Sequence, residues 1–438
     1  MNATIITRTL TSNATIITRT LTSFTLQVEV PYNDSMLDFE ETLQQRLNEA
    51  GVVATAEGLQ QFDTDGAPIT VGPVKLTTKG QVEKDYQTPY GVATVARHVY
   101  QSPQGGPTYC PLDRDARIVV SSTPRFAKIL SHKYAEFSSP RVQIDLEENH
   151  GRVVSRCLIQ DVADAVAAAA LAKEEDWSYT LPKFEEPPAT VAVSLDGTCT
   201  LMCEDGWRET MVGTLAFYDR EGARQHTVYL AATPEYGKAK FLNHLEAEIG
   251  RAKAKCPDAR YVGIADGAQG NWEFLGRHTD VQVTDFWHAV EYLGKAAVVL
   301  YRGQPRTREA WLEEACHRLK HDPGGAEWVL KRLRTLARER PWAKDDEDVQ
   351  RAIRYFANQS GTGRMDYASR VAANEPIGSG VTEAACKVIV KQRLCGSGMK
   401  WTEGGAAVVL SLRALSYTPE RWSQFWSKVD RWGFPVAA

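Results

Sequence analysis

Short apolar runs alternate with longer amphipathic stretches in the middle of the chain, and this order predicts an α/β domain. An apolar run bounded by polar residues predicts a strand, and apolar residues that recur at helical spacing predict a helix. The expected strands are residues 191–195, 212–218, 227–231, 261–265 and 281–284, and the expected helices are residues 239–254 and 286–300. A short helical or irregular link separates the last two strands. Three strands, a helix and two further strands form an α/β pattern.

The region after this domain has helical periodicity throughout. Residues 307–358 are rich in Leu, Arg, Glu and Trp, and Pro323 and Pro341 mark the breaks between helices. We therefore expect an all-helical insertion. A final helix should follow the Gly-Ser-Gly at residues 378–380 and end at about Leu394.

The region before the domain mixes short strands and helices. Helical stretches at residues 126–137 and 141–149 are followed by Gly151 and by an amphipathic helix that Ser155 can cap. This order is compatible with a helix-turn-helix, although three short helices are also common in domains that do not contact DNA. The segment KFEEPPA at residues 183–189 is typical of a linker, because its prolines and glutamates suit neither a helix interior nor a central strand.

A perfect tandem repeat occupies the N-terminus. The sequence NATIITRTLTS at residues 2–12 recurs letter for letter at residues 13–23. A unit this short cannot form a solenoid, which needs units of roughly 20 or more residues. We interpret the repeat as a recent duplication or a misassigned start, and we expect the segment to be poorly ordered.

Composition is typical of a globular protein. With 438 residues the chain exceeds the usual single domain of roughly 100 to 200 residues, so two or three domains are expected. The charged fraction of 24% and the hydrophobic fraction of 43% argue against disorder. No run approaches the roughly 18 apolar residues that span a bilayer, and no signal peptide is visible, so we expect a cytoplasmic protein without a membrane partner. The eight cysteines are scattered, which indicates neither a disulfide framework nor a zinc site.

Local charge is more informative than net charge. The net charge of −4 gives no general sign of a nucleic-acid partner. From residue 384 to 401, however, the chain has no acidic residue, and its basic residues are Lys387, Lys391, Arg393 and Lys400. These four are candidates for contact with a DNA backbone, and a solvated helix face is the alternative.

Three acidic residues are candidates for a catalytic site. Asp196 follows the strand in VSLDGT, and Asp266 follows the strand in VGIADGA. Each alone is typical of a turn, but carboxylates at the ends of neighbouring strands lie close together, and their repulsion is relieved when a cation binds between them. Glu383 supplies a third carboxylate in the first turn of the final helix, where the helix dipole alone also favours an acid.

The residues around these acids resemble a known family. The motifs are ADGAQGNW at residues 265–272, DFWH at residues 285–288 and GSGVTEAACKVIVKQRLCGSGMKW at residues 378–401. Together they resemble bacterial insertion-sequence DDE transposases of the ISKra-type group, which is related to the Mutator-like transposases. The resemblance covers residues 191–415. It implies an RNase H-like fold with an all-helical insertion before the last acid, and it implies DNA cleavage and strand transfer.

The resemblance also implies roles for individual residues. Asp196, Asp266 and Glu383 would be the three catalytic acids and the metal ligands. Asp285 and His288 would lie beside the catalytic centre, although Asp285 also suits the cap of its helix and His288 suits packing in the first turn. Three such carboxylates are expected to hold two Mg²⁺ or Mn²⁺ ions.

The expected partner is double-stranded DNA, both the element's ends and its target, bound by more than one copy of the chain. Trp272, Trp287 and Trp401 can stack on unpaired bases, although tryptophans in such segments are more often part of the core.

These assignments imply a division of the chain. The expected parts are a duplicated tail at 1–23, an N-terminal DNA-binding region at 24–183, the first part of the RNase H-like core at 190–301, the all-helical insertion at 302–374, the second part of the core at 375–418 and a C-terminal tail at 419–438.

Other functions remain as alternatives. The chain could be a transposon-derived DNA-binding protein without activity, or an RNase H-like nuclease that does not transpose. A glycosidase acid pair formed by Asp196 and Asp266 is disfavoured by the basic helix beside the third acid, and chelation distinguishes it because a carboxylate-only glycosidase tolerates EDTA.

Overall fold

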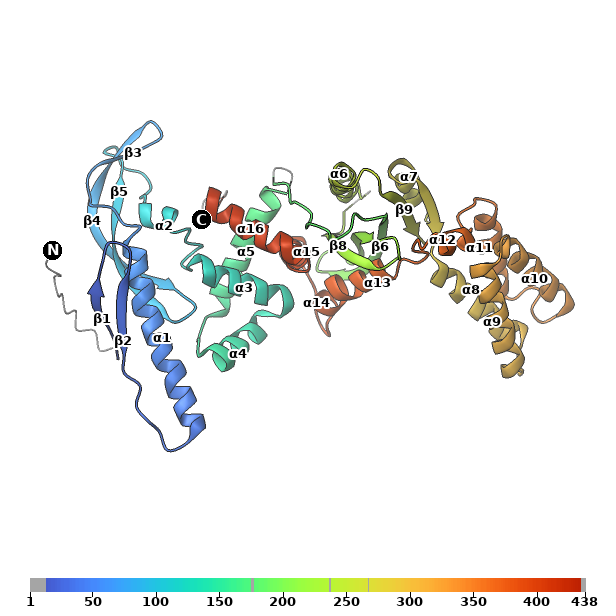
Figure 1. The fold of residues 1–438 in the computed structure, drawn as a ribbon, viewed down its shortest axis with the longest axis horizontal. Helices are drawn as coiled ribbons and strands as arrows, with labels where there is room; N and C mark the ends of the chain where they lie inside the picture. The colour runs from blue at the N-terminus through green and yellow to red at the C-terminus, as the bar shows by residue number, and fades with distance from the viewer. Residues whose placement is uncertain (1–12, 175–176, 236–237, 267, 435–438) are drawn as a thin grey trace. The chain divides into compact units, whose positions relative to one another are not determined.

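The chain folds into two compact units. The computed structural model describes residues 13–174, 177–235, 238–266 and 268–434 (Figure 1). Unit 1 comprises Met1–Tyr179 and Ser411–Ala438, and unit 2 comprises Thr180–Leu410. The predicted linker at residues 183–189 lies at the start of unit 2. Within the described residues, no helix combines the length and the apolar character needed to cross a membrane.

Unit 1 begins with two small antiparallel sheets. β1 pairs with β2, and the second sheet has the order β3-β4-β5. The strands are β1 (Ala14–Arg19), β2 (Phe24–Val28), β3 (Ile69–Val71), β4 (Val74–Gln87) and β5 (Val92–Gln101). Helix α1 (Met36–Gln60), which the side chain of Ser35 caps, contacts both sheets.

The second copy of the N-terminal repeat is a strand, which corrects the expectation of a poorly ordered tail at residues 1–23. Its β-branched sequence ATIITR suits a strand, and β2 supplies the pairing partner, with Ala14 opposite Val28. The first copy, at residues 2–12, lies outside the described residues. The expectation is wrong for the second copy because it rests on the repeat alone, without the strand that follows it.

The remainder of unit 1 is helical. Its helices are α2 (Pro111–Asp115), α3 (Pro124–Glu136), α4 (Ser139–His150), α5 (Arg156–Ala172) and α16 (Pro419–Trp432), together with the end of α15 (Glu403–Ser416). The predicted three helices are confirmed as α3 to α5. Ser155 caps α5 by accepting a hydrogen bond from the Leu158 N–H, and Gly151 has a positive φ of 59° at the end of α4. DNA binding by these helices stays a prediction.

The expected C-terminal tail at residues 419–438 is a packed helix over much of its length. Trp422, Phe425, Trp426 and Val429 recur at helical spacing in α16 and are buried. The buried Arg413 of α15 donates to the carbonyl oxygen of Ala135 in α3 at 2.6 Å. Helix α16 therefore belongs to the core of unit 1.

Unit 2 contains a five-stranded mixed sheet in the order β10-β9-β6-β7-β8. The strands are β6 (Thr190–Met202), β7 (Gly206–Tyr218), β8 (Arg224–Ala232), β9 (Arg260–Ala265) and β10 (Val281–Thr284). β6, β7 and β8 are antiparallel neighbours, whereas β9 is parallel to β6 and β10 is parallel to β9. All five predicted strands exist. One detail differs, because β6 continues to Met202 and Asp196 lies inside the strand instead of at its end.

Alternate residues of the central strands face different sides of this sheet. In β6, Val191 and Val193 join the core under helices α6 (Ala239–Lys255) and α7 (Gln269–His278), whereas Ala192 joins the core under α8 (Phe286–Leu300). α7 forms the predicted link between β9 and β10. Because side chains alternate along a strand, Asp196 faces the α8 side. In β9, Val262 and Ile264 are on the α8 side, so Asp266 continues toward the same side.

The predicted helices of residues 302–374 are present, and their role as an insertion into a catalytic core stays a prediction. Within residues 302–374 the elements are α9 (Pro305–His321), α10 (Gly325–Glu339), α11 (Glu347–Ser360) and α12 (Tyr367–Ala372). Figure 1 shows these helices beside α8, and their buried residues share one core with α8 and with the sheet. The predicted final helix consists of α13 (Gly380–Ala385), the π-helix η1 (Cys386–Lys391) and α14 (Gln392–Leu394).

Candidate functional site

A cleft of about 870 Å³ lies in unit 2 where β6, α8 and the segment from α13 to α14 meet. Two carboxylates, one imidazole, one thiol and two ammonium groups are on its wall. The lining residues are Asp196, Gly197, His288, Gly380, Glu383, Ala384, Cys386, Lys387, Lys391 and Gln392. An acidic interior with lysines beside it suits a cation and a phosphate together.

Asp196 reaches this cleft from β6. Its Oδ1 accepts the Gly197 N–H at 2.7 Å, and the Cys386 thiol donates to its Oδ2 at 3.8 Å. Burial raises the pKa of Asp196, and the charge of Asp266 raises it further, while the Gly197 N–H and His288 oppose the shift. Burial and the nearby Asp196 charge also raise the pKa of Cys386 to about 12, so the thiol stays protonated and keeps its role as donor.

Asp266 lies beside Asp196 at the end of β9. The parallel register pairs Ser194 with Ile264, and two further residues along each strand are Asp196 and Asp266. The Asp266 side chain is exposed and is not part of the cleft wall among the described residues. Its carbonyl oxygen accepts a 3.4 Å hydrogen bond from the Tyr355 hydroxyl in α11, so α11 contacts the residue that follows β9.

Glu383 also lies on the cleft wall, in the first turn of α13. The buried Thr382 hydroxyl hydrogen-bonds the buried Thr214 hydroxyl of β7 at 2.7 Å, which holds α13 on the α8 side of the sheet. Burial raises the pKa of Glu383, and the charges of Asp285 and Asp196 raise it further. The acids are therefore close enough for their charges to repel.

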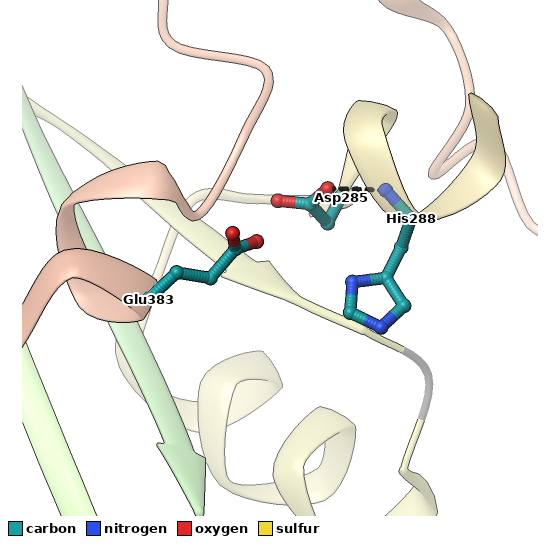
Figure 2. Close-up of side chains that lie close together, drawn as sticks. All are labelled: Asp285, His288 and Glu383. Atoms are coloured by element: carbon teal, nitrogen blue, oxygen red, sulfur yellow. Dashed lines mark hydrogen bonds between the residues drawn. The ribbon is translucent and has the colours of Figure 1, made fainter. Parts of the chain in front are cut away.

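Asp285 is a structural cap, so the simpler of its two predicted roles is confirmed. It is fully buried, and its Oδ1 accepts the His288 N–H at 2.7 Å at the start of α8 (Figure 2). Its Oδ2 accepts the Ser379 hydroxyl at 2.6 Å and also the Ser379 N–H. The same hydroxyl lies 3.2 Å from Glu383 Oε1. Asp285 therefore joins α8 to the start of the helix that holds Glu383.

Asp285, His288 and Glu383 form a group that could hold a metal ion. One ligand atom from each lies within 4.8 Å of the others (Figure 2). A carboxylate has about four lone-pair positions, and Asp285 already uses three for hydrogen bonds. Imidazole also suits transition metals better than Mg²⁺. This group therefore fits a metal, but its donor atoms do not select Mg²⁺.

The predicted triad and this group share only Glu383. Asp196 joins Glu383 on the wall of the cleft, whereas Asp266 interacts with Asp196 through its charge. His288 belongs to the cleft wall and lowers the pKa of both Asp196 and Glu383. Asp196 and Glu383 are therefore close enough for their charges to interact. Asp266 interacts with Asp196 in the same way, and Asp285 interacts with Glu383.

The four basic residues predicted to contact DNA do not share one surface. Lys387 and Lys391 line the cleft, and Lys400 is exposed but is not part of its wall. Arg393 is buried with its guanidinium over the Trp401 ring at 5.3 Å, which corrects its assignment to the DNA-binding face. The physical reason is helical spacing, because six residues separate Arg393 from Lys387 and place it on a different side of the helix.

Sequence reasoning missed two residues of the site. The Gly-Ser-Gly pattern marks Ser379 only as part of the turn before α13, and no motif singles out Cys386. Cys386 follows Glu383 by three residues, and that spacing on a helix predicts a shared face. No local pattern reveals the Ser379 contact, because Asp285 is 94 residues away.

Comparison with known proteins gives no family. A scan against protein-family models and a search of curated proteins found no match for this chain. The geometry of the site and the sequence motifs are therefore the basis for a functional assignment.

Proposed function

We propose that unit 2 is a metal-dependent phosphoryl-transfer enzyme with an RNase H-like core. The observation that carries this proposal is that Asp196 and Glu383 line one cleft on one side of the mixed sheet, and that Asp266, at the end of β9, interacts with Asp196 through its charge. The antiparallel strands β6 to β8, extended by the parallel strands β9 and β10, are the arrangement expected of such a core. The helical insertion before Glu383 supports the same assignment.

Within that class, the particular enzyme is a DDE transposase of an insertion sequence. The resemblance of the motifs at residues 285–288 and 378–401 to ISKra-type transposases supports this choice over an RNase H-like nuclease or a DNA-binding protein without activity. The substrate would be double-stranded DNA at the ends of the element, and Lys387 and Lys391 on the cleft wall would bind its phosphates. Two copies or more would assemble on the paired ends.

The proposed metals are Mg²⁺ or Mn²⁺, bound as two ions by the carboxylates of Asp196, Asp266 and Glu383. These three carboxylates offer only oxygen donors. Oxygen donors suit hard cations better than the mixed oxygen and nitrogen donors of the group that contains His288. When bound, the ions supply the charge that activates a water or a DNA 3′-hydroxyl and that stabilises the leaving oxygen. The protein would hold the ligands in position. Thr382 fixes α13 to the sheet, and the hydrogen bonds of Ser379 to Asp285 and Glu383 fix the position of the Glu383 side chain.

The test is cleavage and strand transfer of the element's own end DNA in Mg²⁺. Asp266→Asn and Glu383→Gln should each lower the rate by at least about a hundredfold, as expected for loss of a group that stabilises developing charge. Both variants should still bind the DNA. Glu204→Gln is the matched control, because Glu204 is an exposed acid in the turn after β6.

Each outcome distinguishes the candidates. Activity that survives in either variant means that the triad is misassigned. Cleavage without strand transfer favours a nuclease, and DNA binding without any cleavage favours a protein that lost its activity. Gel filtration on a duplex that bears one end tests the assembly, and a single protomer per duplex contradicts it.

A further inference from the structure

Trp287 leaves most of a large aromatic side chain in solvent beside the candidate site. Its side chain is 60% exposed, whereas Phe286 before it is 4% exposed and Trp272 in α7 is 2% exposed. An exposed indole loses the burial free energy that the core offers it. Trp401, the third tryptophan with a candidate role in base stacking, is only partly exposed and lies under Arg393.

The position of Trp287 is fixed by the same elements that form the site. It lies in the first turn of α8, between the cap residue Asp285 and His288 on the cleft wall. Its ring meets Phe286 edge-on, with centroids 5.4 Å apart. A helix holds the ring more rigidly than a loop would, and a ring fixed in advance loses less entropy when a partner stacks on it.

Gly378 makes room for this ring. A Cβ at residue 378 would lie 2.9 Å from Trp287 Cδ1 and 3.2 Å from its Nε1, closer than ordinary contact. The five-membered ring of the indole therefore lies directly against the backbone that leads into Ser379 and α13. A larger residue at 378 would displace either the indole or the segment that holds Glu383.

We propose that Trp287 is a stacking platform for an unpaired nucleobase of the DNA bound at this site. The proposal rests on the proposed function, because a nucleic acid must occupy the cleft. An indole face stacks on any base, so the platform would take an unstacked nucleotide of any sequence next to the bond that reacts. Lys387 and Lys391 on the cleft wall supply the charge for its backbone.

The experiment compares DNA with and without unpaired bases on the full-length chain. Fluorescence anisotropy in EDTA measures affinity for a labelled single strand of about 12 nucleotides and for the blunt duplex of the same sequence. Trp287→Ala should weaken single-strand binding roughly five- to hundredfold and leave duplex binding unchanged within about twofold. Trp287→Phe should retain most of the affinity, because an aromatic face remains.

Trp207→Ala is the matched control, since Trp207 is 65% exposed in the same unit but lies at the start of β7, whereas Trp287 is next to His288 of the cleft wall. Equal single-strand affinity in Trp287→Ala and wild type overturns the inference, and so does an equal loss for single strand and duplex. If the wild type binds and cleaves DNA but Trp287→Ala behaves as wild type, only this inference fails. If the wild type binds neither DNA, the proposed function fails as well.

Discussion

Asp196 on β6 and Asp285 at the start of α8 belong to the same side of one sheet, yet their carboxylates meet different surroundings. Asp285 is fully buried and accepts three hydrogen bonds from His288 and Ser379. Asp196 accepts one backbone N–H and one long bond from a thiol, and its pKa is raised by burial and by Asp266.

This difference gives the two acids different roles. Asp285 supports the structure of the site, whereas Asp196 is available to bind a cation. Hydrogen bonds stabilise a buried carboxylate without any ligand, so Asp285 needs no metal. A carboxylate with few donors beside another negative charge is destabilised until a cation arrives. We therefore expect substitutions of the two acids to have opposite effects on stability, and metal affinity to depend on Asp196 more than on His288.

Metal binding should give the largest effect. Glu383→Gln removes the ligand common to both candidate groups and should weaken Mn²⁺ binding by more than about a hundredfold, beyond the roughly 10- to 100-fold that loss of a supporting residue costs. His288→Gln should weaken it less than about tenfold. Isothermal titration calorimetry measures both. An equal loss in the two variants would place the metal in the group of Asp285, His288 and Glu383.

Removing the Asp285 carboxylate should cost the most stability. Asp285→Ala leaves the His288 N–H at the start of α8 and the Ser379 N–H without an acceptor, and the Ser379 hydroxyl keeps only Glu383, so the free energy of unfolding should fall by about 3 kcal/mol. Urea unfolding measures it, and Asp285→Asn, which keeps a capping oxygen, should lose less. Asp346→Ala, which removes the cap of α11 without a second tether, should lose only about 1 kcal/mol. A loss no larger than that control would show that the Ser379 contact contributes nothing.

Removing the Asp196 charge should have the opposite sign. Because its pKa is raised in the folded chain, the folded state keeps this proton to higher pH than the unfolded state does. Stability therefore falls as the pH rises from the unfolded pKa through the folded one. Without metal at pH 7, Asp196→Asn should stabilise the protein by about 1 kcal/mol. The difference should vanish below about pH 3, where the acid is protonated in both states. Thermal unfolding across this range checks it, and a less stable Asn variant at pH 7 would contradict the argument.

The lysines should give the smallest effect. Lys387→Gln or Lys391→Gln should weaken duplex binding a few-fold and reduce the slope of log affinity against log salt by about 0.9 for each phosphate that the variant no longer neutralises. Lys344→Gln is the control, since Lys344 is exposed in the insertion and is not part of the cleft wall. Slopes that match the control would show that neither lysine binds the DNA backbone.

Most of the secondary structure could be predicted from the sequence, because it follows from local patterns. Apolar runs and helical spacing predicted all five strands of the unit 2 sheet and the helices on either side. The cap of α8 is similarly local, since the Asp285 side chain and the His288 N–H are three residues apart. Asp196 and Asp266 were predicted as site residues for the same reason, as acids that follow apolar runs.

The partners of these residues required the folded chain. The Ser379 bond to Asp285 spans 94 residues, and the Cys386 contact with Asp196 spans 190. In the sequence Arg393 is one more basic residue of a helix, but packing against Trp401 buries it. β6 extends past Asp196 because β7 pairs with it as far as Met202. Such contacts depend on which distant segments pack together, and local sequence patterns do not specify that packing.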